Sequence, residues 1–165
     1  MDILIREATE DDYEELKELF DQGSTIHHEA EPGIIGPPSE RPTTRGFLFR
    51  LLNDEHSGLF VAELSKPEAD DHKLAGFIQL SFQDTDGIPG LASRRYVLVM
   101  DVEVREEHRG QGVGHMLMSA AEEWALDKGA DQLELAVWEF NHRALALYER
   151  LGYRTIYRQM VKNLT

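Results

Sequence analysis

The 165-residue sequence contains no cysteine and no long apolar run. The absence of cysteine excludes disulfides, cysteine-ligated zinc and any mechanism that passes through an acylated cysteine. Without an apolar run of about 20 residues, no segment is a candidate transmembrane helix. The first residues, MDILIREATEDD, are acidic where a signal peptide would need a basic flank and an apolar stretch. We therefore expect a cytoplasmic location and no membrane partner.

Basic residues are also scarce, with 17 Lys and Arg against 31 Asp and Glu. The formal net charge of −14 opposes binding to nucleic acid, because phosphates are bound by Lys and Arg. Such a charge could favour encounter with a cationic partner such as an amine, or could serve solubility alone. The length and the 41% of hydrophobic residues are ordinary for one globular domain over residues 1–165.

Apolar periodicity and turn residues predict an alternation of strands and helices without internal repeats. Strands are predicted at 2–7, 58–64, 74–82, 96–104, 132–138 and, as one or two closing strands, 153–164. Helices are predicted after Thr9 and over about 42–53, 112–128 and 141–150, with a Gly/Pro-rich loop at 22–38. This order predicts a mixed α/β fold, in which a mixed, mostly antiparallel sheet carries helices on both faces.

The most informative segment is a glycine-rich turn between the strand at 96–104 and the next helix. Its residues, 109–114, read Arg-Gly-Gln-Gly-Val-Gly. Glycines let the backbone approach a ligand closely, and the free N–H groups of a helix N-terminus attract phosphate oxygens. The turn therefore predicts a pyrophosphate cradle, although glycines at such turns are often only structural. A dinucleotide fingerprint would need a third glycine where His115 stands, and a P-loop would need Gly-Lys-Ser/Thr.

Two motifs resemble those of a known family. RxxGxG at 109–114 is similar to the Q/R-x-x-G-x-G/A signature of the GNAT superfamily of N-acetyltransferases, and NxxAxxxYxxxGY at 141–153 is similar to its N-x-x-A-x-x-x-Y-x-x-x-G-F/Y segment. Together they cover about residues 96–154, with strands and helices in the family's order. The resemblance implies a GNAT-type fold, acetyl-CoA as co-substrate without a metal, and acetyl transfer to a primary amine by direct attack in a ternary complex.

The resemblance also implies roles for single residues. Backbone N–H groups would hold the pyrophosphate of CoA at Arg109, Gly110, Gln111, Gly112, Val113 and Gly114. The main chain at Val102 and Val104 would pair with the pantetheine arm, which Asn141 and Ala144 would also contact. Tyr148 would lie beside the thioester sulfur and protonate the leaving thiolate, as a phenol with a pKa of about 10 can do. Packing beneath the sheet is the alternative for this tyrosine.

An attacking amine must first lose a proton, so the site needs a base or a water chain. Regular alternation of the strand 96–104 would place Asp101 and Glu103 on the side of Val97 and Val99. Acids near this position serve the family as the base or as ligands of the substrate amine, so Asp101 is the first candidate and Glu103 the second. Both could instead be solvated acids at a strand end, and a bulge would reverse their sides.

Adjacent histidines occur in the predicted loop at 22–38, directly before Glu29. No further His or Asp spacing supports a metal site there. Because this loop borders the acceptor site in related folds, His28 is a candidate for shaping that site and for acting as a base.

The sequence leaves several questions of function open. No motif identifies the acceptor, which could be a cationic small molecule, an amino acid, an aminoglycoside or a protein N-terminus. The chain could be a monomer or a homodimer. A non-catalytic CoA-binding sensor or interaction module of the same fold is the alternative function, and a simple nucleotide or phosphate binder would leave the second motif unexplained.

Overall fold

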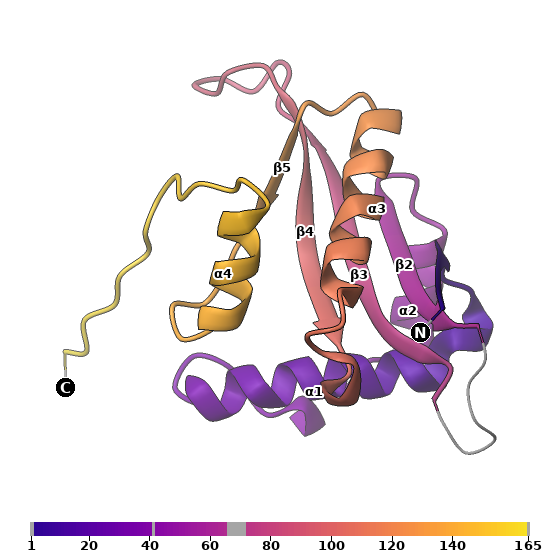
Figure 1. Cartoon of the computed structure of the whole chain (residues 1–165). Helices are drawn as coiled ribbons and strands as arrows, with labels where there is room; N and C mark the ends of the chain where they lie inside the picture. Colours follow the sequence, from indigo (N-terminus) through magenta and orange to yellow (C-terminus); the bar gives the residue numbers. More distant parts are fainter. Residues whose placement is uncertain (1, 41, 66–71, 165) are drawn as a thin grey trace.

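The chain is described here from a computed structural model that covers residues 2–40, 42–65 and 72–164. Five strands form one sheet in the order β1-β2-β3-β4-β5 (Figure 1). Their bounds are β1 Ile3–Glu7, β2 Ser57–Leu64, β3 Leu74–Asp84, β4 Arg95–Val104 and β5 Gln132–Leu135. Neighbouring strands are antiparallel except β4 and β5, which are parallel. The predicted mixed, mostly antiparallel sheet is confirmed.

Helices cover both faces of this sheet (Figure 1). The α-helices are α1 Tyr13–Ala30, α2 Arg45–Leu52, α3 Val113–Asp127 and α4 His142–Arg150, and short 3-10 turns lie at Glu10–Asp12, Pro38–Glu40 and Glu106–His108. One apolar cluster joins α1 and α2 to one face, and a second joins α3 and α4 to the other. In the described parts of the chain, no helix is both long and apolar enough to cross a membrane.

Strand β3 is buried on both faces, as its nearly continuous apolar sequence LAGFIQL predicts. Phe77 is fully buried in the cluster with α1 and α2, where its ring centroid lies 4.2 Å from that of Phe20. Ile78 and Leu80 belong to the cluster with α3. The two half-cores therefore meet at this strand, which is the rigid support for its neighbour β4.

A bulge divides β4 at Met100. Val99 pairs with Leu80 and Asp101 pairs with Gln79, so Met100 has no counterpart in β3. One extra residue reverses the alternation of all side chains that follow it. The second half of β4 therefore points its side chains to the faces opposite to those that regular alternation would give.

The orientation that regular alternation gives the two carboxylates of β4 is therefore wrong, and the alternative, reversal by a bulge, is what the structure shows. Asp101 and Glu103 lie on the face that carries α1, whereas Val97 and Val99 belong to the cluster with α3. The contact with α1 is close, since a Cβ atom built on Gly23 would lie 2.9 Å from Oε2 of Glu103.

The loop predicted at 22–38 is also wrong in its first half, because α1 continues to Ala30. Gly23 does not end the helix; it gives room to a strand side chain that packs against it. The helix ends only at Glu31, immediately before Pro32 and Gly33.

The last two predicted strand boundaries differ from the structure as well. Strand β5 ends at Leu135 instead of 138, and residues 153–164 form no strand. A strand needs a neighbour to receive its backbone hydrogen bonds. Among the described residues, nothing pairs with either segment.

Candidate active site

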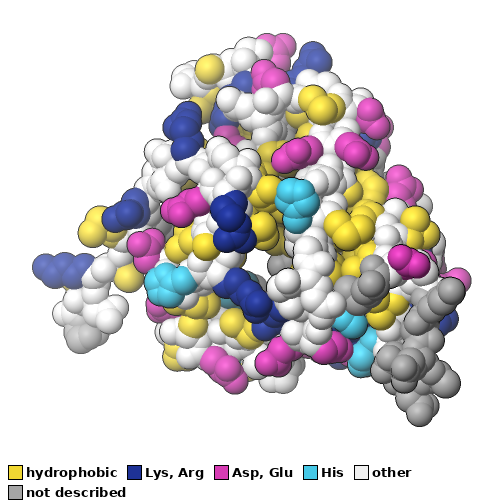
Figure 2. Space-filling model, viewed as in Figure 1, with side chains coloured by type: hydrophobic (Ala, Val, Ile, Leu, Met, Phe, Trp, Pro, Cys, Tyr) yellow, Lys and Arg dark blue, Asp and Glu magenta, His cyan; other side chains and the backbone are white. Residues whose placement is uncertain are grey.

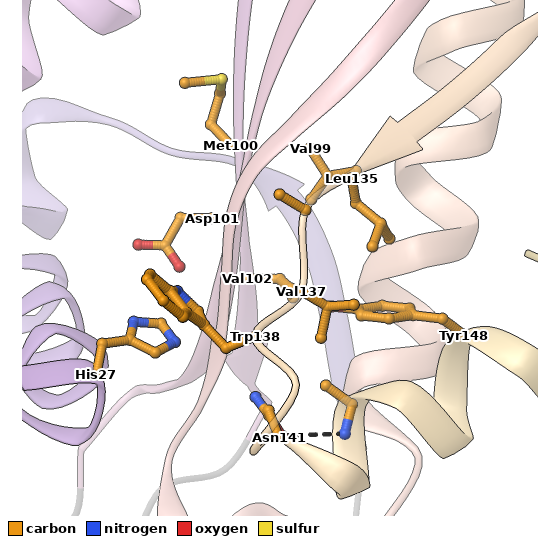
Figure 3. Close-up of a pocket in the computed structure, with 12 residues that line it drawn as sticks. His27, Val99, Met100, Asp101, Val102, Leu135, Val137, Trp138, Asn141 and Tyr148 are labelled. Carbon is orange, nitrogen blue, oxygen red and sulfur yellow. Dashed lines mark hydrogen bonds between the residues drawn. The ribbon is translucent and has the colours of Figure 1, made fainter. Parts of the chain in front are cut away.

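The site lies where the two parallel strands separate. Strands β4 and β5 pair from Tyr96–Gln132 to Val99–Leu135 and then diverge. A cavity of about 270 Å³ lies at the point of divergence and is lined by β4, by the chain that follows β5, by α4 and by the last part of α1. Because it opens between two strands, groups on both faces of the sheet reach it (Figure 3).

The glycine turn predicted to bind pyrophosphate joins β4 to α3. Gly110 and Gly112 have φ values of +75° and +90°, a backbone conformation that other residues adopt only with strain. No backbone hydrogen bond from the amides of residues 110–112 is found in the described structure, and the first N–H groups of a helix have no partner within it. A Cβ atom built on Gly112 would meet nothing within 4 Å. The turn therefore presents free donors to open space, which fits a pyrophosphate.

Neighbouring groups contact three members of this turn, and one of these contacts contradicts the predicted cradle. The amide of Arg109 donates to the carbonyl of Glu106, so it is not free for a ligand. Gly114 packs against α4, since its Cβ position lies 3.3 Å from Cδ2 of Leu147. Beside Gly110, the exposed guanidinium of Arg143 lies 3.4 Å from the built Cβ position and adds a cation at the edge of the turn.

The side chain of Arg109 points back into the protein. Its Nη2 donates to Oε1 of Glu103 at 2.9 Å, and its Nε donates to the carbonyl of Val104 at 2.9 Å. Oε1 of Glu103 also accepts from Nε2 of Gln22 in α1 at 2.8 Å. Glu103 thus links the glycine turn, β4 and α1, and its carboxylate is already engaged. This arrangement favours a positioning role over the role of base.

Fewer backbone groups of β4 are free for pantetheine than the sequence predicts. The amide of Val104 lies 3.3 Å from Oε1 of Glu103, and its carbonyl accepts from Arg109. Val102 lines the cavity directly. The main chain at Val102 is therefore the better placed of the two to meet a ligand.

Asp101 lies on the α1 side of the cavity, with His27 and Trp138 beside it (Figure 3). Burial raises the pKa of its carboxyl to about 6, and the negative charge of Glu103 acts in the same direction. A backbone hydrogen bond from Val102 opposes this rise. At neutral pH the group is a carboxylate, and its pKa lies close to the surrounding pH, which suits a general base.

Tyr148 enters the cavity from α4, on the opposite wall (Figure 3). Burial raises the pKa of its phenol to about 12, with further contributions from the charges of Asp101 and Glu103. The hydroxyl is therefore protonated at neutral pH. At the start of the same helix, Oδ1 of Asn141 accepts from the amide of Ala144 at 3.1 Å, which leaves the Asn141 NH₂ group as a donor at the cavity wall.

The histidine that reaches the cavity is His27, not the predicted His28. Nδ1 of His28 lies 2.6 Å from the carbonyl oxygen of Ile35, within the segment that follows α1. The ring of His27 packs at 6.3 Å from Trp138 and 5.9 Å from Phe140, centroid to centroid. His27 and Trp138 thus lie beside Asp101 at the cavity, and the sequence analysis missed His27 because it placed residues 22–38 in a loop. In the described residues no group of three or more metal-ligating side chains occurs.

The site thus combines a glycine turn at a helix N-terminus with two separating parallel strands and with an acid and a phenol across the gap between them. Residues 8–153 match the acetyltransferase (GNAT) family, and the chain belongs to this family.

Several relatives share this similarity. A stretch of 58 residues is 47% identical to thialysine N-epsilon-acetyltransferase from Bos taurus, covering 35% of this chain and 34% of that protein. The chain is 28% identical over 149 residues to the uncharacterized N-acetyltransferase YhfO from Bacillus subtilis, covering 90% of this chain and 88% of YhfO. A crystal structure of a mutant BH1408 protein from Bacillus halodurans superimposes with a TM-score of 0.89 at 27% identity, covering 98% and 99% of the two chains. The similarity spans about a third of the length of the thialysine acetyltransferase.

Replacement of Asp101 by asparagine should stabilise the folded chain at neutral pH. The pKa of this carboxyl is raised from 3.8 to about 6, so the folded state binds the proton more tightly than the unfolded state. The full stability is therefore present below pH 3.8 and is lost as the pH rises through 6. The shift corresponds to at most about 3 kcal/mol, which partial exposure reduces to about 1–2 kcal/mol.

We expect Asp101→Asn to raise the melting temperature by roughly 2–6 °C at pH 7.5 and by about half as much at pH 5. Scanning calorimetry at the two pH values measures this difference. Asp2→Asn is the matched control, because this exposed aspartate precedes β1, lies at no helix end and should give no gain. A melting temperature that is unchanged or lowered by Asp101→Asn at pH 7.5 would contradict the assignment.

Proposed function

We propose that the chain is an acetyl-CoA-dependent N-acetyltransferase that moves the acetyl group to a primary amine by direct attack in a ternary complex. The observation that carries the proposal is the meeting of Asp101 and Tyr148 at one cavity, on opposite walls. The free amides of residues 110–114, Val102 and Asn141 would hold the CoA moiety. Bound in this way, acetyl-CoA supplies a thioester carbonyl that an amine can attack.

Asp101 would act as the base. Its carboxylate lies on the side of α1, where an acceptor could enter beside His27 and Trp138. It would take a proton from the acceptor ammonium, so that the nitrogen lone pair becomes available for the carbonyl carbon. As the C–N bond forms and the C–S bond breaks, the sulfur receives the departing electron pair. The nitrogen, positively charged after the attack, releases a second proton, which would restore the phenol of Tyr148 after it has protonated the sulfur.

Tyr148 would protonate this sulfur. The charge of Asp101 is one cause of the raised pKa of Tyr148. When Asp101 accepts the proton of the amine, that charge is neutralised and the phenol becomes a stronger acid. Transfer of the amine proton to Asp101 therefore favours transfer of the Tyr148 proton to the sulfur. The reaction needs the two transfers in this order.

The acceptor would be a small, cationic amine. A carboxylate and the aromatic ring of Trp138 on the wall of a cavity of about 270 Å³ both attract an alkylammonium group. Thialysine N-epsilon-acetyltransferase, which resembles this chain over 58 residues, is named for an amine of this kind. The net charge of −14 would assist the encounter.

A CoA-binding module without catalysis is the second candidate. It would need the glycine turn and Asn141, but it would need neither a phenol nor a carboxylate at the cavity. The burial of both groups raises their pKa values, which opposes ionisation of each of them. Binding of CoA alone would not require the Asp101 carboxylate or the Tyr148 phenol.

Removal of the Tyr148 hydroxyl should lower turnover and leave acetyl-CoA binding nearly unchanged. We expect Tyr148→Phe to reduce kcat by roughly 100-fold, because general acid catalysis contributes at least about this factor. The rate is measured as thiol release with a panel of primary diamines, and the affinity by calorimetry.

Tyr153→Phe is the matched control for this variant. Tyr153 packs against Tyr148 at 5.7 Å between ring centroids, and its buried hydroxyl has no hydrogen-bond partner in the described structure. This variant should retain kcat within about twofold of the unmodified chain. Equal kcat values for Tyr148→Phe and Tyr153→Phe would exclude Tyr148 as the general acid.

The rate should also depend on pH through Asp101. Below a pKa of about 6 its carboxyl is protonated and cannot accept the proton of the amine. We expect kcat at saturating substrates to fall about tenfold per pH unit below pH 6 and to level off above it. In Asp101→Asn the remaining rate should be low and should not show this fall of kcat below pH 6. The same fall in both proteins would exclude Asp101 as the base.

A further inference from the structure

Arg109, the first residue of the glycine turn, points its side chain into the protein. Its Nη2 donates to Oε1 of Glu103 and its Nε donates to the carbonyl of Val104, both at 2.9 Å. Its amide donates to the carbonyl of Glu106. An arginine beside a phosphate site ordinarily offers its donors to the phosphate. Here the side chain and the amide are both engaged within the chain, so Arg109 serves the turn in another way.

The partner of Arg109 is a nearly buried carboxylate. The side chain of Glu103 is 12% exposed, against 24% for Arg109. Its Oε1 also accepts from Nε2 of Gln22 in α1 at 2.8 Å. Removal of one partner from a buried ion pair is strongly destabilising, because the other charge is left uncompensated. Glu103 is not among the described residues that line the cavity, so it acts on a ligand only through its partners.

Helix α1 leaves room for this carboxylate. Gly23 is buried, and a Cβ atom built on it would lie 2.9 Å from Oε2 of Glu103. His27, four residues further along, lies on the same face of the helix and lines the cavity. Helix α1 packs on the face of the sheet opposite to α3, whose N-terminus carries the turn (Figure 1). One carboxylate thus connects elements that lie on the two faces of the sheet.

We propose that Glu103 is a positioning residue for acetyl-CoA, which holds the glycine turn in place by joining Arg109 to α1. The affinity of the turn for the pyrophosphate would then depend on a helix on the other face of the sheet. The same helix carries His27, so the turn and the α1 wall of the cavity would be fixed relative to each other. This role rests on the proposed function, in which acetyl-CoA is the ligand of the turn.

Charge alone would give Glu103 the opposite effect. The face of the protein in Figure 2, which includes the end of α3 at which the turn lies, carries Asp and Glu side chains among Lys and Arg. Because the pyrophosphate is an anion, removal of an acid near the turn should strengthen its binding. Loss of Glu103 would also free the cation of Arg109. A positioning role predicts weaker binding instead, so the sign of the change separates the two effects.

Calorimetric titration of three variants with acetyl-CoA measures this sign. Glu103→Ala removes the acceptor of Arg109 and Gln22 and should raise the dissociation constant roughly tenfold, within the usual range for coupled sites. Glu103→Gln keeps an oxygen for Arg109 and should restore part of the affinity. Glu107→Gln, at an exposed acid two residues before Arg109, is the matched control for charge. It should bind acetyl-CoA at least as tightly as the unmodified chain.

Gly23→Ala tests the same contact without altering either charged residue. Its methyl group would displace the Glu103 carboxylate, whereas alanine itself favours the helix. We expect the dissociation constant of acetyl-CoA to rise at least about fivefold, with a melting temperature within about 3 °C of the unmodified chain. A merely structural contact would change the melting temperature and leave the affinity unchanged.

Gly46→Ala is the matched control for this substitution. Gly46 also lies in a helix, α2, and the nearest atom to its built Cβ position is 3.7 Å away. This variant should change neither the affinity for acetyl-CoA nor the melting temperature.

Unchanged or tighter binding of acetyl-CoA by Gly23→Ala or by either Glu103 variant, with the fold verified by circular dichroism, would overturn the proposal. An equal loss of affinity in Glu107→Gln would overturn it as well. Should Glu103→Ala fail to fold, Gly23→Ala and Glu103→Gln decide the question. Failure of the unmodified chain to bind acetyl-CoA would refute the proposed function, whereas binding that all variants retain would refute the positioning role alone.

Discussion

Strands β4 and β5 share only four residue pairs before they separate, and the chemistry of the chain depends on this short ladder. A longer ladder would close the gap with side chains and hydrogen bonds. Because the strands part after Val99 and Leu135, a cavity opens through the sheet and receives groups from both faces. The bulge at Met100 turns Asp101 towards α1, and α4 brings Tyr148 from the other side. Asp101 and Tyr148, the proposed base and acid, thus come from opposite faces of the sheet and meet at one cavity.

The burial of these ionisable groups destabilises the folded chain, and apolar packing elsewhere in the fold compensates for this loss. Asp101 and Tyr148 are both held where burial opposes their charged forms. Two apolar clusters on the two faces of β3 fix the strands around them. Glu103 and Arg109 then tie the glycine turn to β4 and α1, so that the two halves of the site keep their relative positions.

Sequence reasoning reached the fold and the glycine turn because both depend on local patterns. Apolar periodicity identified the helices and the central strands, and the glycines within residues 109–114 indicate the backbone conformation of the turn. It failed where a tertiary contact overrides a local signal. Gly23 suggests the end of a helix, but it lies within α1 and gives room to Glu103, and the helix continues past it to Ala30.

The sequence could not decide between regular alternation and a bulge in β4, and it wrongly predicted the closing strands, for a related reason. One extra residue in β4 is visible only in the pairing with β3, so the side on which Asp101 lies could not be read from alternation. Strand propensity at 153–164 is real, yet it is not expressed without an edge to pair with. Both failures concern partners that are distant in the sequence.

Calorimetric titration with acetyl-CoA, with NAD as a control ligand, measures whether the folded chain binds the proposed co-substrate. We expect one site per chain for acetyl-CoA and no heat from NAD. Gly112→Val, at a position with φ of +90°, should abolish this binding, whereas Gly33→Val, at an open position with ordinary φ, should retain it. Absence of acetyl-CoA binding by the unmodified, folded chain would contradict the account, and undiminished binding by Gly112→Val would refute the role of the glycine turn.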